Sequence, residues 1–96
     1  MAHVFWTDES LQYIAEIYKY IAKDSPQNAD SFLNRMMDSV ETQLLLSAEI
    51  GRITPEFQNP SKREIIYEKY RVMYTVSDDK QTAYITQVQH GAKPLI

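Results

Sequence analysis

The sequence predicts an α+β domain in which a helical hairpin packs on a small antiparallel sheet, in the order β-α-α-β-β-β. The first observation is that residues 7–46 repeat apolar side chains at helical spacing, interrupted only around "DSP". The second is that residues 63–90 hold three runs rich in β-branched and aromatic residues, separated by short polar turns. A chain of 96 residues has room for one core, so we expect a single domain over residues 1–96.

One strand and two helices are expected in the N-terminal half. "AHVFW" (2–6) is short, β-branched and aromatic, which is typical of a strand. Thr7 offers a hydroxyl N-cap for the first helix, and acidic residues follow it in the first turn. Ser25 as N-cap and Pro26 at the first helical position start the second helix. Because at most four residues join the helices, they should form an antiparallel hairpin.

The first helix is apolar over more of its circumference than the second. Its expected core stripe consists of Leu11, Ile14, Ala15, Tyr18, Ile21 and Ala22. A second stripe beside it consists of Tyr13, Ile17 and Tyr20. A helix this apolar either packs on two sides within the domain or is completed by a partner, and the sequence leaves both open. The second helix has one stripe, formed by Ala29, Phe32, Leu33, Met36, Met37, Val40 and Leu44.

The C-terminal half is expected to begin with an irregular loop and to continue as a sheet. Residues 47–62 contain two prolines and a glycine and exceed the usual length of a connection, so this loop is either functional or anchored by its own apolar residues. Strands are expected at 63–67, 70–76 and 82–90. The turns between them are "EK" and "SDDK".

Composition excludes several classes of protein. The chain has no cysteine, which excludes disulfides and thiolate chemistry and fits a reducing cytoplasm, where we expect the protein to act. We expect no signal peptide, and no apolar run approaches the ~20 residues that span a bilayer. Residues 1–50 carry a net charge of −5 and residues 51–96 a net charge of +2. The basic half suggests a surface that meets anions, whereas the pI of about 5.3 argues against strong, non-specific binding to nucleic acid. We expect no direct sequence-specific binding to nucleic acid either.

Arg71 and His90 are the residues best suited to carry chemistry. RNA cleavage without a metal needs a base, an acid and a cation that stabilises the phosphorane. Arg71 can supply the cation and His90 the acid or base, with further charge from nearby lysines and arginines. Arg71 can equally form cross-strand ion pairs with Glu64 or Glu68, and His90 can be a hydrogen-bonded residue at a strand end. Two histidines 87 positions apart, without an acidic cluster at ligand spacing, predict no metal site, and no motif predicts a cofactor.

Several segments together resemble the ParE branch of the RelE/ParE toxin superfamily. They are "YIAKDSPQNADSF", "EIGRITPEF", "REI", "YRVMYTV" and "VQHGAKPL", and the resemblance runs from about Trp6 to Leu95. It implies the RelE/ParE fold, with the element order derived above. It also implies the toxin of a bacterial type II toxin–antitoxin system, neutralised by a small cognate antitoxin, either ParD-like or of another type. ParE toxins are implied to poison DNA gyrase, whereas their RelE relatives cleave messenger RNA on the ribosome.

The catalytic set of the RelE ribonucleases is incomplete in this sequence. Arg71 matches the arginine in the "YR" of those enzymes, and Lys93 falls near another of their basic positions. However, Thr75 stands where some of them carry arginine, and the sequence ends at Ile96 without the C-terminal tyrosine of RelE. We therefore expect a toxin that acts by binding gyrase rather than an enzyme.

Two sets of residues are predicted to bind partners. The residues predicted to contact the target are Arg63, Arg71, His90 and Lys93, and those predicted to contact the antitoxin are Tyr13, Ile17 and Tyr20. The main alternative is a RelE-like, ribosome-dependent endoribonuclease that uses Arg71 and His90. A second alternative is a degenerate member of the superfamily that binds an antitoxin without being toxic.

Overall fold

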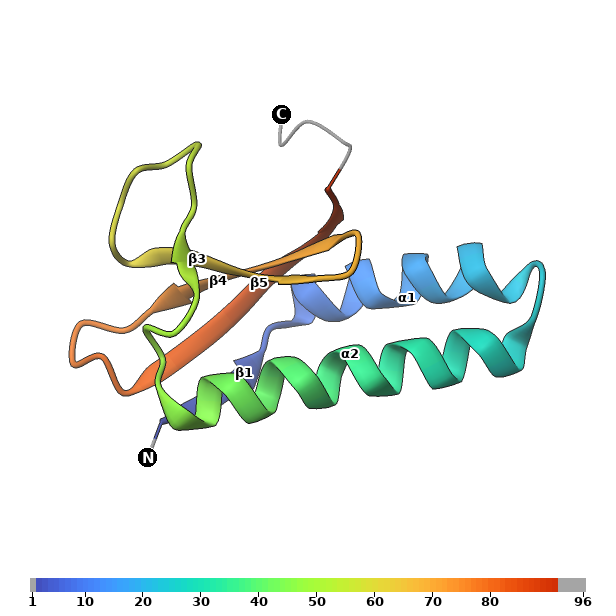
Figure 1. Ribbon diagram of the computed structural model, residues 1–96, viewed down its shortest axis with the longest axis horizontal. Helices are drawn as coiled ribbons and strands as arrows, with labels where there is room; N and C mark the ends of the chain where they lie inside the picture. The colour runs from blue at the N-terminus through green and yellow to red at the C-terminus, as the bar shows by residue number, and fades with distance from the viewer. Residues whose placement is uncertain (1, 92–96) are drawn as a thin grey trace.

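Two helices lie against one face of a five-stranded sheet in the computed structural model, which describes residues 2–91. The elements in chain order are β1 (His3–Trp6), α1 (Asp8–Ala22), α2 (Pro26–Leu46), β2 (Arg52–Ile53), β3 (Lys62–Tyr67), β4 (Tyr70–Val76) and β5 (Thr82–His90). The strand order across the sheet is β1-β5-β4-β3-β2. In Figure 1 the helices run side by side, and the yellow-green loop between β2 and β3 projects from the sheet on the side away from α2.

The predicted fold class is confirmed, and the structure refines the description of the sheet. The pairs β2–β3, β3–β4 and β4–β5 are antiparallel, as short connections require, whereas β1 lies parallel to β5 at the edge of the sheet. The sheet is therefore mixed rather than antiparallel. Strands at opposite ends of a chain share no turn, so no local sequence signal gives their relative direction. The two-residue strand β2 lies within the expected loop at 47–62 and was missed because it is too short to show a period.

Both predicted helix starts are confirmed by their caps. The Thr7 hydroxyl accepts a hydrogen bond from the Ser10 amide, and the Ser25 hydroxyl accepts one from the Asn28 amide. Each bond satisfies one of the amides that lack an intrahelical partner in the first turn. The caps thereby fix where the two helices begin relative to the sheet.

The buried stripe of α2 agrees with the sequence pattern, whereas the buried face of α1 is rotated from the predicted one. Leu11 was predicted to be in the core but is 44% exposed, and Ala15 is also exposed. Ser10 is fully buried instead, and Ile17 of the predicted outer stripe packs partly against the core. Ser10 tolerates burial because its hydroxyl donates to the Thr7 carbonyl at 2.7 Å. The hydrogen bonds between Ser10 and the N-cap Thr7 thus place Ser10, rather than Leu11, on the buried face. Hydrophobic periodicity does not reveal such a capping contact.

Gly51 lies where the sheet approaches the loop too closely for a side chain. Its amide donates to the Tyr74 hydroxyl at 2.8 Å, and a Cβ on Gly51 would lie 2.6 Å from the Glu64 carbonyl oxygen and 2.7 Å from the Tyr74 hydroxyl. We therefore expect Gly51→Ala to lower the free energy of unfolding by ~1–3 kcal/mol, because backbone must move to admit the methyl group. Urea denaturation of both proteins measures this difference.

Tyr74→Phe is the control for this prediction. It removes the hydroxyl but leaves the Glu64 carbonyl oxygen in place, so it should cost about 1 kcal/mol by itself and should not rescue Gly51→Ala in the double variant. A Gly51→Ala variant with the wild-type urea midpoint would show that the loop can move away without cost.

Candidate functional site

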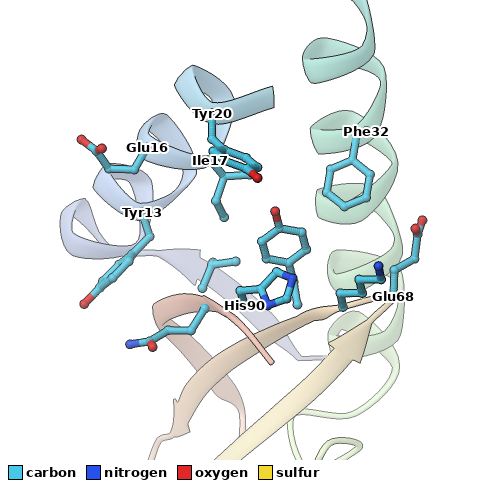
Figure 2. Close-up of a pocket in the computed structure, with 11 residues that line it drawn as sticks. Tyr13, Glu16, Ile17, Tyr20, Phe32, Glu68 and His90 are labelled. Carbon is cyan, nitrogen blue, oxygen red and sulfur yellow. The ribbon is translucent and has the colours of Figure 1, made fainter. Parts of the chain in front are cut away.

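A groove of about 870 Å³ opens between the two helices and the adjoining ends of β4 and β5. It is lined by Tyr13, Glu16, Ile17, Tyr20, Phe32, Glu68, Lys69, Tyr70, Val88, Gln89 and His90. In Figure 2, Ile17 and Tyr20 from α1 face Phe32 from α2 across the opening, and His90 lies at the base. Most of these side chains are apolar or aromatic, as is typical of a binding groove.

The stripe predicted on α1 forms one wall of this groove. Tyr13, Ile17 and Tyr20 are spaced at i, i+4 and i+7, which brings them onto one side of the helix. Tyr20 is 71% exposed and Tyr13 is 37% exposed, although both are large and largely apolar. The structure therefore brings the three predicted residues together on an accessible surface. Their binding of an antitoxin stays a prediction.

The base of the groove is an aromatic cluster centred on Tyr70. Its ring lies 5.5 Å from the ring of Phe32 and 5.5 Å from that of His90, the latter pair edge to face. Burial raises the pKa of the Tyr70 phenol, and the nearby Tyr20 raises it further, so the hydroxyl stays protonated at neutral pH. Tyr70 was not among the predicted site residues. Its position opposite His90 depends on the register of β4 and β5, which the sequence alone does not give.

The opposite face of the sheet carries an ionic cluster built around Arg71. The Arg71 Nη1 and Nη2 atoms donate to the two carboxylate oxygens of Glu56 at 2.8 and 2.6 Å. Its Nε and Nη2 atoms donate to Oε1 of Glu64 at 3.0 and 2.7 Å. These hydrogen bonds raise the pKa of the Arg71 guanidinium above its already high value. The cation is therefore neutralised by two carboxylates within the fold.

Glu64 is the innermost member of this cluster. Its side chain has no exposed surface, and its second oxygen accepts a hydrogen bond from Arg52 Nε at 2.6 Å. The expected ion pair between Arg71 and Glu64 is present, and the second carboxylate at Arg71 comes from Glu56 rather than from Glu68. Sequence reasoning missed Glu56 and Arg52 because they lie in or beside an irregular loop, where no periodicity predicts which side chain faces the sheet.

The predicted target-binding residues are not gathered on one surface. Adjacent residues of a strand point to opposite faces, so Tyr70 and His90 belong to the groove, whereas Arg71 belongs to the ionic cluster. Arg63 donates to the carbonyl oxygens of Glu49, Gly51 and Pro60, an arrangement that anchors the chain before and after β2. Lys93 lies outside the described residues.

Neither the groove nor the ionic cluster is arranged as a metal site. Among residues 2–91, no group of three or more histidine, cysteine or acidic side chains is placed to hold a metal ion. Over the same part of the chain, no helix has both the length and the apolar character needed to cross a membrane.

The contact between Glu56 and Arg71 predicts a pH-dependent contribution to stability. Hydrogen bonding to Arg71, reinforced by a backbone hydrogen bond, lowers the pKa of Glu56 from 4.5 to about 2. A carboxylate with a depressed pKa stabilises the fold fully above its unfolded pKa, and this contribution disappears as the pH falls towards the folded pKa. We expect the difference in melting temperature between wild type and Glu56→Gln to be largest above pH 5 and to shrink between pH 4.5 and 2.

Thermal denaturation followed by circular dichroism, at pH steps from 7 to 2, measures this difference. Glu68→Gln serves as a control, because it removes an exposed carboxylate that does not contact Arg71. A difference between wild type and Glu56→Gln that stays constant across the whole pH range would show that the carboxylate does not bind Arg71 in solution.

Comparison with known proteins places this geometry in a family. The family model described as the ParE toxin of the type II toxin–antitoxin system parDE matches residues 4–95. No curated protein matches the chain. Among solved structures, the chromosomal ParDE toxin–antitoxin system from P. aeruginosa superposes with a TM-score of 0.74 at 18% identity, covering 94% of this chain and 96% of that one.

A second solved structure shares the fold more loosely. The RelBE2 toxin–antitoxin complex from Mycobacterium tuberculosis gives a TM-score of 0.55 at 16% identity, covering 93% of this chain and 96% of that one. At these identities the two structures show a common fold. The match of the family model extends over nearly the whole sequence and confirms the predicted resemblance. The chain therefore belongs to the ParE toxin family of type II toxin–antitoxin systems.

Proposed function

We propose that this protein acts by binding DNA gyrase in the cytoplasm, without chemistry of its own, and that a cognate antitoxin neutralises it by filling the aromatic groove. The observation that carries the proposal is the pairing of Arg71 with Glu56 and Glu64. Arg71 is the cation that the ribonuclease alternative requires, and in this fold its charge is already balanced.

Catalysis depends on the preorganisation of such a cation. Electrostatic stabilisation of a transition state is effective because donors already point to where charge develops. Here Nε, Nη1 and Nη2 of Arg71 all point at carboxylates, one of which is fully buried. A phosphorane would have to displace a carboxylate at the moment of reaction. Binding to a protein tolerates the displacement of a carboxylate, because the free energy of that displacement enters only the affinity of the complex and not the barrier of a chemical step.

The groove supports an antitoxin that binds as an amphipathic helix. Such a helix anchors apolar residues at i, i+3 or i+4 and i+7 in a groove of complementary width. Tyr13, Ile17 and Tyr20 offer a wall with that periodicity, Phe32 closes the opposite side and Tyr70 lies at the base. His90 lies at the base of the same groove. An occupied groove therefore also covers one of the residues that we propose to contact the target.

The gyrase proposal is tested by inducing the toxin without antitoxin in cells. Plasmid supercoiling, chromosome breaks and the ends of ribosome-bound transcripts are measured in the same culture. We expect loss of supercoiling and DNA breaks, with transcript ends unchanged by the protein itself. Purified protein should likewise inhibit supercoiling by purified gyrase.

Two substitutions separate binding from ribonuclease chemistry. Losing an arginine that stabilises a phosphorane lowers a rate by ~100-fold or more, and lysine cannot replace its planar fork. Under the binding proposal, Arg71→Lys weakens the ionic cluster and is mild for toxicity, and His90→Gln leaves toxicity within a few-fold. Purified protein that cuts ribosome-bound RNA, and loses this activity in both variants, would establish the ribonuclease instead. A soluble, antitoxin-binding protein that affects neither DNA nor RNA would identify a degenerate member.

The antitoxin surface is tested by alanine substitutions on α1. Tyr13→Ala and Tyr20→Ala should each weaken the complex with the antitoxin by ~1–3 kcal/mol, because aromatic anchors dominate such interfaces. Tyr84→Ala is the matched control, since Tyr84 is an exposed tyrosine that packs against Phe5, away from the groove. Isothermal titration calorimetry measures the affinities. If Tyr84→Ala weakens the complex more than both α1 variants, the antitoxin binds the other face.

A further inference from the structure

The loop between β2 and β3 folds over the sheet face that faces away from the helices. It closes on itself through the amides of Phe57 and Gln58, which both donate to the Thr54 carbonyl, and it is tied to β3 by the Thr54 amide, which donates to the Lys62 carbonyl. In Figure 1 this loop projects from the sheet, with few neighbours along its outer edge. Its contact with the ionic cluster is the pair of hydrogen bonds between Glu56 and Arg71.

Glu56 and Arg71 differ in how far they are exposed. The Glu56 side chain is 39% exposed, whereas that of Arg71 is 11% exposed. The carboxylate therefore lies above the guanidinium and separates it from solvent. Glu64 accepts hydrogen bonds from Arg71 on one carboxylate oxygen and is itself held by Arg52 on the other, and neither contact involves the loop carboxylate. The guanidinium would keep its position if Glu56 moved away.

A pocket of about 230 Å³ lies between the same loop and the sheet, lined in part by Phe57, the loop residue that follows Glu56. Its lining includes Thr54, Phe57, Lys62, Met73 and Gln87. The Thr54 hydroxyl is buried and has no hydrogen-bond partner among the described residues. The Lys62 ammonium lies 5.9 Å from the centre of the Phe57 ring. A cation and an open volume therefore lie beside Phe57, next to Glu56 in the loop.

We propose that the loop is a displaceable cover and that Glu56 is an internal ligand standing in for a carboxylate of the target. This inference rests on the proposed function, because it names how a bound protein would engage Arg71. An acidic side chain from the target replaces Glu56 on the guanidinium while its neighbouring residues enter the pocket. The exchange conserves two charge-assisted hydrogen bonds, so it costs little. Without the Glu56 carboxylate, Glu64 is the carboxylate that remains in the ionic cluster beside Arg52 and Arg71, and Lys62 adds a further positive charge nearby.

The occupant is an acidic protein segment rather than nucleic acid. The site already holds a carboxylate in the bidentate geometry that arginine prefers, which shows directly that its shape fits this group. A domain that binds nucleic acid is expected to be basic, whereas this chain carries a net charge of −3 and has a pI of about 5.3.

The first test measures binding of a hexaglutamate peptide by fluorescence anisotropy at low salt, with the full chain and without any gyrase. In wild type the peptide can bind Arg71 only in the fraction of molecules in which Glu56 has moved away, which we call the open state. Removing the Glu56 carboxylate should therefore raise the apparent affinity for the peptide by the inverse of that fraction. If the open state is populated at 10% or less, Glu56→Gln binds the peptide about tenfold more tightly than wild type or better. Glu9→Gln, which changes the net charge equally at the start of α1, should leave the affinity at the wild-type value.

The second test asks which arginine the peptide reaches. In the Glu56→Gln protein with ¹⁵N-labelled arginine, the peptide should shift the Nε resonance of Arg71 and leave that of Arg63, which is held by carbonyl oxygens. In the Glu56→Gln background, Arg71→Lys should abolish the gain in affinity. In the otherwise wild-type chain it weakens the contacts with Glu56 and with the target alike, which is why it stays mild for toxicity. An oligonucleotide of equal charge should show no gain.

Three results would overturn the proposal. They are equal peptide affinities in wild type, Glu56→Gln and Glu9→Gln, an unmoved Arg71 resonance, or a gain for the oligonucleotide alone. None of these measurements contains gyrase, so failure of the gyrase proposal and failure of the displaceable cover are distinguishable.

Discussion

The burial of the Glu64 carboxylate is the constraint on which the outer face of the sheet depends. A charged group without exposed surface is stable only when its partners are placed accurately, and removing one partner is costly. Here the partners come from β2 and β4, the strands on either side of β3. Arg71 also donates from Nη1 and Nη2 to the Glu56 carboxylate, so its position determines where Glu56 lies and thereby the position of the loop. One buried charge thus links the packing of three strands to the conformation of the loop most open to partners.

Strand alternation on β4 gives the two sides of the sheet different chemistry. Tyr70 and Arg71 are neighbours in the chain, yet Tyr70 packs with Phe32 and His90 in the groove, whereas Arg71 binds the two glutamates on the other face. The groove is apolar and complements the stripe of α1, which is suited to burial by a helix. The ionic face offers charges that are already paired, which is suited to exchange with another charged surface. The molecule therefore offers two surfaces of different chemistry, one on each side of the sheet.

The sequence predicted the elements whose signals are local and missed the contacts that depend on register. The caps at Thr7 and Ser25, the stripe of α2 and the three C-terminal strands follow from residues within one turn or one period. The parallel pairing of β1, the short β2 and the roles of Glu56 and Tyr70 require the sheet to be assembled first. Tyr13, Ile17 and Tyr20 were predictable as one stripe, but the sequence left open whether the domain or a partner completes it; the structure exposes Tyr13 and Tyr20 and packs Ile17 partly against the core. Arg71 was predictable as a charged residue in a strand, but its neutralisation by a loop carboxylate was not.

The separation of the two faces restricts how the proposed neutralisation by an antitoxin can work. A partner confined to the groove covers His90 and Tyr70 but does not reach Arg71, because the sheet lies between them. Such a partner blocks the target only if the target contacts the groove or its rim as well as the ionic face. A partner that also blocks the ionic face must continue past the edge of the sheet and compete there with Glu56. If neutralisation needs an antitoxin segment that extends beyond the groove, part of the surface that binds the target lies on the ionic face. The longer the segment that is needed, the larger that part is.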